Sequence, residues 1–99
     1  TIMKTKSATT KPLFALGRTL ATPGALDLLD RTATNSLAII ERHVHGDWGD
    51  LCQEDRQAND EAVNLPLRIF SSYRLGEHKL WCITEADRSV TTLLLPTEY

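Results

Sequence analysis

The first two thirds of the chain carry apolar residues at helical spacing. Thr22 is a good N-cap and Pro23 suits the first helical position, while Asn35 can cap a second helix that Gly46 ends. Each helix has an apolar stripe (Leu26, Leu28 and Leu29 in the first; Leu37, Ile40 and Val44 in the second). The pattern therefore predicts two amphipathic helices before residue 47.

Weaker signals flank these two helices. Residues 13–20 fit a short strand that Gly17 interrupts. Asp50 is predicted to open a third helix, with Gln53 three residues on as its capping-box partner. The apolar stripe of this third helix is thin, so we expect the helix to lie on the surface. Residues 1–12 are polar and are predicted to form a flexible arm, which leaves residues 13–99 as one domain.

The hydrophobic period changes from helical to alternating at Pro66. Three runs then fit β-strands, and short connections join them (strands at 67–74, 79–84 and 89–95; turns at 75–78 and 85–88). In the middle strand we expect Trp81 and Ile83 to share one face, with Trp48 and Trp81 both directed to the seam between helices and sheet. The predicted fold class is α+β, with two to three N-terminal helices packed on a C-terminal antiparallel meander of three strands, or four.

Composition narrows the functions that such a domain can have. The 99 residues carry 11 basic and 13 acidic side chains, a net charge of -2, so the basic excess usual in non-specific nucleic-acid binders is absent. Cys52 and Cys82 belong to no CxxC pair and are expected to be reduced. No apolar run approaches the roughly 20 residues of a membrane span. We therefore expect a cytoplasmic protein with no membrane partner.

The densest polar segment of the chain, residues 42–50, is a candidate site. A metal hypothesis takes His43, His45 and Asp47 as ligands, but helical geometry would separate the two histidines, so we expect no metal and no cofactor. The loop remains a candidate binding site, because loops on rigid scaffolds often carry function. The alternative is a structural turn whose polar groups satisfy one another. The binding candidates are Arg42, Asp47, Trp48 and Asp50.

A small metal-independent ribonuclease of toxin type is an alternative function. Such catalysis needs a proton shuttle with a pKa near neutrality, a cation for the phosphorane and polar donors for its oxygens. The helix-plus-meander layout of barnase and RelE-type toxins is similar to the order of elements expected here. This hypothesis requires a histidine to lie within reach of Arg88 or Glu85 across an open cleft. The catalytic candidates are His43, His45, Glu85, Arg88 and Thr92.

Three motifs resemble a family of small bacterial proteins that plasmids and integrative elements frequently carry. They are ATPGAL (residues 21–26), RHVHGDWG (residues 42–49) and ITEADRSVTTLLLPTEY (residues 83–99). The likeness runs from about Leu16 to the last residue, with Pro66 where the family usually has a glycine. No catalytic residues are established for that family. The resemblance implies an accessory protein of mobile DNA in the bacterial cytosol, and we expect it to act by binding a host or plasmid protein.

Overall fold

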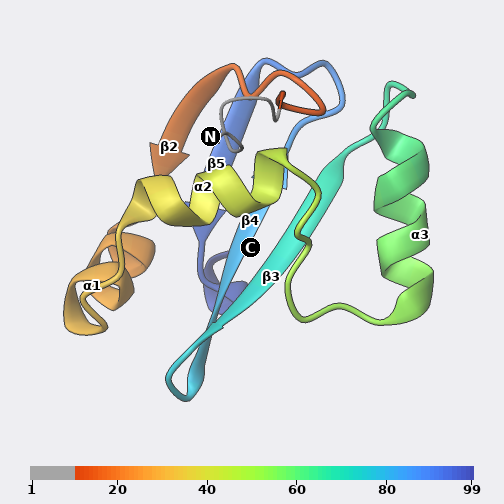
Figure 1. Cartoon of the computed structure of the whole chain (residues 1–99). Helices are drawn as coiled ribbons and strands as arrows, with labels where there is room; N and C mark the ends of the chain where they lie inside the picture. Colours follow the sequence, from red (N-terminus) through yellow and green to blue (C-terminus); the bar gives the residue numbers. More distant parts are fainter. Residues whose placement is uncertain (1–10) are drawn as a thin grey trace, which may run out of the picture.

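A mixed four-stranded β-sheet with three α-helices forms the part of the chain that the computed structural model describes, residues 11–99 (Figure 1). The elements follow one another as β2 (Arg18–Ala21), α1 (Pro23–Arg31), α2 (Ser36–Val44), α3 (Gln53–Ala62), β3 (Ile69–Leu75), β4 (His78–Thr84), β5 (Val90–Leu94) and the 3-10 helix η2 (Pro96–Glu98). The α+β class is confirmed. Most of the predicted arm, residues 1–10, lies outside the described residues.

The strand order of the sheet is β2-β5-β4-β3. The predicted antiparallel meander is confirmed for β3, β4 and β5, but the prediction of a purely antiparallel sheet is wrong. β2 pairs in parallel with β5, from Arg18 opposite Val90 to Ala21 opposite Leu93. The expectation that all helices precede the strands is also wrong, since β2 comes before α1 and η2 follows β5. The long connection that parallel strands require is supplied by everything between β2 and β5.

The first two helices begin where the sequence predicts, and the third does not. Thr22 Oγ1 accepts a hydrogen bond from the Ala25 amide at 3.1 Å, and Asn35 caps α2 in the same manner. α3 begins after Cys52 rather than Asp50, and Cys52 makes no side-chain capping bond. The physical reason is that the Asp50 amide donates to the Ser72 carbonyl at 2.6 Å, which holds residue 50 beside β3.

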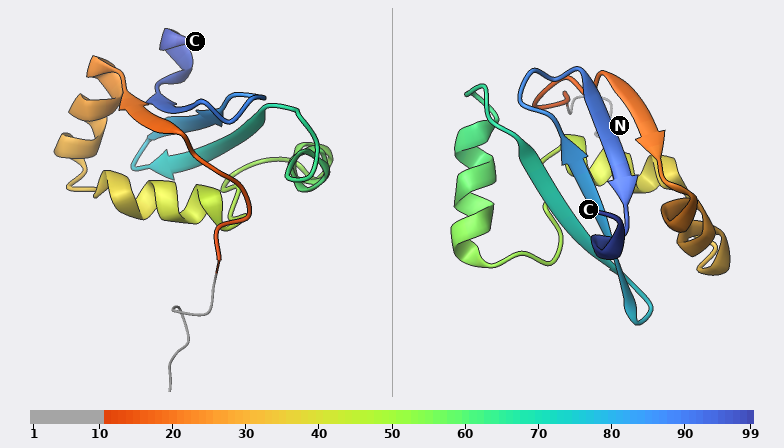
Figure 2. Two further views of the ribbon diagram at one scale, coloured as in Figure 1. Left: turned by 90° about the horizontal axis from the view of Figure 1, so that it is seen from above. Right: turned by 180° about the vertical axis from the view of Figure 1, so that it is seen from behind.

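The two faces of the sheet have different coverings. Figure 2 shows α2 across one face and η2 over the other, with α1 and α3 toward opposite edges. On the α2 side, buried residues of helices and strands form the main core (Ala25, Leu28, Leu29, Ile39, Tyr73, Leu80, Cys82 and Leu93). A second buried cluster lies beside it (Phe14, Val44, Trp48, Ala62 and Ile69). We call the opposite side, which η2 partly covers, the open face.

The two faces of β4 are reversed relative to the sequence prediction. Leu80 and Cys82 belong to the core, so the alternate residues Trp81 and Ile83 lie on the open face. Trp81 therefore does not lie at the helix–sheet seam with Trp48. Both sets of alternate positions in this strand are largely apolar, so its pattern does not say which set faces the helices.

Side chains and a loop cover the outer edge of β3. The Asn59 amide group of α3 donates to the Phe70 carbonyl at 2.6 Å and accepts from the Phe70 amide at 3.2 Å. One step further along, the Ser72 amide donates to the Trp48 carbonyl at 3.1 Å. Gly49 adopts φ +77°, and a Cβ there would overlap the Ser72 carbonyl oxygen. The residue 42–50 loop is thereby fixed as an extension of the sheet. Within the described residues, no helix is long and apolar enough to cross a membrane.

Candidate functional site

His43 lies in a buried chain of hydrogen bonds that joins α2 to the sheet. Its Nδ1 is 2.6 Å from Ser71 Oγ on β3, and its Nε2 is 2.9 Å from Thr84 Oγ1 on β4. Thr84 Oγ1 is 2.7 Å from Thr91 Oγ1 on β5, which in turn donates to the Leu16 carbonyl at 2.7 Å. His43 is fully buried, so each of its ring nitrogens needs such a partner.

The protonation of His43 follows from this chain. A carbonyl oxygen can only accept, so the Thr91 hydroxyl donates its proton to the Leu16 carbonyl. The Thr84 hydroxyl must therefore donate to Thr91 Oγ1. Thr84 therefore accepts from His43 Nε2, and the Ser71 hydroxyl donates to the unprotonated Nδ1. Burial lowers the pKa of His43 to about 4, which agrees with a neutral ring. A neutral, enclosed imidazole is suited to holding elements together.

The rest of the residue 42–50 loop is held by local contacts. Arg42 and Asp47 form an ion pair at 2.7 Å, and their hydrogen bond raises the pKa of Arg42 and lowers that of Asp47. The Arg42 guanidinium lies over the ring of Tyr73, whose hydroxyl donates to the Asp47 carbonyl at 2.7 Å. Within the described residues, the His45 ring bonds only to the preceding helical turn, where its Nδ1 donates to the Glu41 carbonyl at 2.8 Å.

Trp48 and Asp50 tie the loop to its neighbours. Trp48 is 5% exposed, and its indole nitrogen donates to Asp60 of α3 at 2.9 Å. The Asp50 carboxylate is 3.8 Å from Lys79 of β4. The polar groups of this loop therefore have partners inside the fold, in the arrangement expected of a structural turn.

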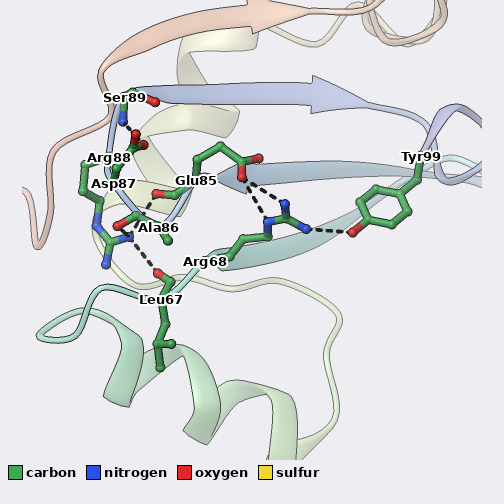
Figure 3. A network of polar contacts seen from close by, with 8 residues as sticks. All are labelled: Leu67, Arg68, Glu85, Ala86, Asp87, Arg88, Ser89 and Tyr99. Atoms are coloured by element: carbon green, nitrogen blue, oxygen red, sulfur yellow. Dashed lines mark hydrogen bonds and ion pairs between the residues drawn. The ribbon is translucent and has the colours of Figure 1, made fainter.

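Arg88 donates to main-chain carbonyl oxygens on three segments, and Figure 3 shows its contacts with Leu67 and with its own turn. Arg88 lies in the turn between β4 and β5, where its guanidinium donates to the carbonyls of Glu85 and Ala86. It also donates to the carbonyl of Leu67, which precedes β3. It also donates to the carbonyls of Ala62 and Leu65 at the end of α3, at 2.6 and 3.0 Å. Its backbone has φ +61°, a left-handed conformation that is strained for a residue with a side chain. Arg88 thus connects the end of α3 to the β4–β5 turn.

Glu85 and Thr92 lie apart from both histidines, on the open face. Glu85 pairs with Arg68 at 3.0 Å, and Arg68 donates to the Tyr99 hydroxyl at 2.8 Å (Figure 3). Thr92 pairs with Ile83 across β4 and β5. Among residues 11–99, no hydrogen bond or ion pair joins His43 or His45 to Glu85, Arg88 or Thr92.

An aromatic groove lies on the open face, formed by residues that the sequence hypotheses did not select as a site. It has a volume of about 220 Å³ and is lined by Arg68, Phe70, Trp81, Ile83 and Tyr99. The Trp81 ring contacts Phe70 edge-on at 4.9 Å and Tyr99 at 5.7 Å between ring centroids. Phe70 and Trp81 are half-buried, and Tyr99 is 71% exposed.

The C-terminal residues hold Tyr99 over this groove. The Glu98 carboxylate accepts hydrogen bonds from the Thr22 hydroxyl, the Gly24 amide and the Leu95 amide. These bonds lower the pKa of Glu98, and the bond from Thr22 has the largest effect. Glu98 thereby links η2 to the first turn of α1, where an anion is favourable. The aromatic groove is built from a rigid sheet and an anchored terminus.

Further basic side chains lie on the same face of the sheet as the aromatic groove. The register of β3 and β4 puts Arg74 directly opposite Lys79, on the same face as Phe70 and Trp81. Arg18 of β2 is opposite Val90, which shares the face of Thr92. Arg18 and Arg74 form no ion pair within residues 11–99. Two other cations of this face have carboxylate partners, since Arg68 pairs with Glu85 and Lys79 lies 3.8 Å from Asp50. A basic surface thus lies on a chain whose net charge is -2.

A larger hollow of about 390 Å³ lies at one end of the sheet, between α1, the β3–β4 turn and η2. Its charged lining has both signs, with Glu77 beside His78 and Lys79, and its Arg31 is paired with Asp27. No phenylalanine, tyrosine or tryptophan is among its lining residues. We therefore take the aromatic groove, rather than this hollow, as the candidate site.

Searches of protein-family models, curated proteins and solved structures found no match to this chain.

Proposed function

We propose that this chain is a non-catalytic binding module whose macromolecular partner lies on the open face of the sheet. The observation that carries the proposal is the aromatic groove, in which Trp81, Tyr99 and Arg68 are all accessible on one rigid surface. These three residue types supply most of the binding energy at macromolecular interfaces. Large rings left partly in water are costly unless a ligand covers them.

The environments of His43 and Arg88, two residues that the ribonuclease hypothesis assigns to catalysis, favour binding over catalysis. A proton shuttle must reach its substrate and must change charge near the working pH. His43 is enclosed, with a pKa of about 4, and the Arg88 guanidinium is already surrounded by carbonyl oxygens. Neither group is free to act on a substrate, and we therefore favour a binding function over the ribonuclease alternative.

The genetic origin and the cellular compartment of this binding module are proposed from the sequence. On the resemblance to proteins of plasmids and integrative elements, we propose that the module is an accessory protein of mobile DNA in bacteria. Two free cysteines, with Cys52 exposed, suit a reducing compartment such as the cytoplasm. Burial raises the pKa of Cys82 to about 12, so that thiol is a packing residue with little nucleophilic character.

The test is affinity purification from a bacterial lysate with three forms of the chain. The first is wild type, and the second changes two exposed residues of the groove, Arg68→Gln with Tyr99→Ser. The matched control makes the same kinds of change among the helices, Arg31→Gln with Leu37→Ser, at residues that are also exposed. Bound proteins are identified by mass spectrometry and bound nucleic acids by sequencing.

The proposal predicts a specific partner that the wild type and the control retain and that the groove variant loses. Retention of the same molecules by all three forms would contradict it, as would retention of nothing by the wild type.

A further inference from the structure

The open face carries cations and aromatic rings in a regular arrangement, and two of the cations, Arg68 and Lys79, have carboxylate neighbours in Glu85 and Asp50. Arg68 immediately precedes β3 and Arg74 lies near the other end of that strand, with Phe70 between them, and on β4 Lys79 and Trp81 repeat the pairing of a cation with a ring. Arg74 and Lys79 are both exposed and directly opposite each other, an arrangement of like charges that destabilises a sheet. An anionic ligand would relieve that repulsion.

The ligand must match the rings as well as the charges. Arg68 and Arg74 are six positions apart along the chain, which in extended backbone is a length of roughly 20 Å. A ligand with anionic groups spaced along its backbone can reach cations at both ends of the aromatic groove at once. Between those ends, it has to present flat apolar groups to Trp81 and Tyr99.

Resting on the proposed function, we propose that the open face binds single-stranded nucleic acid. Unpaired bases stack against Trp81 and Tyr99, as bases do on aromatic residues of other binding sheets. Arg18 and Arg74 hold phosphates, and phosphates near Arg68 and Lys79 compete with Glu85 and Asp50 for these two cations. Duplexes are excluded from this mode, because their bases are already stacked on one another.

The open face recognises the nucleic acid mainly through base stacking and phosphate charge. Within this face, aromatic stacking tolerates any base, so we expect weak sequence preference. The acidic helix α3 lies elsewhere, at the edge of the molecule, and carries Glu54, Asp55, Asp60 and Glu61. These carboxylates repel phosphates from the α3 surface. The binding strand is thereby confined to the open face even though the chain as a whole is acidic.

The experiment measures fluorescence anisotropy of a labelled oligouridylate of about ten nucleotides, a length inside the site sizes of roughly 4–16 nucleotides of single domains. It compares the wild type with a double variant, Arg74→Gln with Lys79→Gln, and with a stacking variant, Tyr99→Ser. The matched control, Arg31→Gln with Arg56→Gln, removes the same charge from exposed helix positions. Circular dichroism and denaturation midpoints confirm that each form is folded.

The wild type should bind in a salt-dependent manner, and the control should bind equally well. The double variant should bind about tenfold more weakly or worse, with the slope of log K against log salt reduced by about 1.4, since each lost phosphate contact removes about 0.7. The Tyr99→Ser variant should weaken binding with an unchanged slope. A duplex of the same length should bind at least tenfold more weakly.

Two further probes separate the failure of this inference from the failure of the proposed function. If a labelled peptide of ten glutamates binds the open face and the oligouridylate does not, the partner is an acidic polypeptide and the nucleic-acid inference is overturned, while the binding module stands. Equal binding of oligouridylate by the wild type and the double variant also overturns it. If the groove variant retains every lysate partner as well, the proposed function fails with it.

Discussion

Thr84 Oγ1 lies 2.7 Å from Thr91 Oγ1 on the covered side of the sheet, and this contact fixes the direction of every hydrogen bond around His43. Because Thr91 donates to Leu16, the Thr84 oxygen has to accept from the imidazole. A protonated imidazole would donate from both nitrogens, and Ser71 would then have to turn its own proton elsewhere. The folded state therefore has a strong preference for neutral His43.

The first prediction is that stability falls with acid because of His43. The pKa of this group is about 4 in the folded chain and near 6.5 in the unfolded chain, so the unfolded state binds more protons between these values. Stability should be complete above about pH 6.5 and decrease as the pH falls toward 4, by a total of about 3 kcal/mol. Urea denaturation at several pH values measures it.

The control for this prediction separates His43 from other titrating groups. His43→Gln keeps a donor and an acceptor but does not titrate, so its stability should be nearly flat between pH 6.5 and 4. Asp47 and Glu98 have lowered pKa values, so their contributions are lost at more acidic pH. An unchanged slope in His43→Gln would contradict this assignment.

The second prediction concerns two glycines with left-handed backbone. Gly49 has φ +77° and no room for a Cβ against Ser72, whereas Gly76 has φ +64° and open space around it. Gly76→Ala should cost only the conformational term of about 1–2 kcal/mol. Gly49→Ala should cost several times more or prevent folding, because the loop must leave β3. Equal denaturation midpoints for the two variants would show that residues 48–50 are not bound to the sheet edge.

The third prediction concerns Arg88. Its planar guanidinium reaches carbonyls on α3, on the segment after α3 and in its own turn, which one ammonium cannot do. Arg88→Lys should lower the free energy of unfolding by about 2 kcal/mol or more, since bonds from charged donors are strong. The same change at Arg68, which is exposed, should leave the denaturation midpoint close to that of the wild type. A similar effect at both positions would contradict a structural role specific to Arg88.

Local signals in the sequence were sufficient for most of the architecture. Thr22 and Asn35 cap helices through contacts with residues two or three positions away, so the sequence shows them directly. β2 was not predicted in its bounds or its pairing, because a four-residue strand carries little periodicity and its partner is more than 70 residues away. The sequence predicts a helix start at Asp50. It cannot show the competing bond to Ser72, because that bond depends on tertiary contact.

The candidate site was harder to predict for a related reason. A histidine followed by a GDWG loop looks the same in a sequence whether its partners are solvent, a substrate or Ser71 and Thr84, which are 28 and 41 residues distant. The signal for the aromatic groove was present in the alternation of Arg68 with Phe70 and in Trp81. It became interpretable only when the face of β4 was known.

The most direct test of the open face uses the two tryptophans, which lie on different sides of the sheet. Trp81 lines the aromatic groove, whereas the Trp48 indole is bonded to Asp60 and buried. In a ¹⁵N–¹H spectrum, each indole gives its own signal during titration with unlabelled oligouridylate. The account predicts that the Trp81 signal shifts in a saturable manner while the Trp48 signal stays in place. Movement of the Trp48 signal alone, or of neither signal, would contradict it.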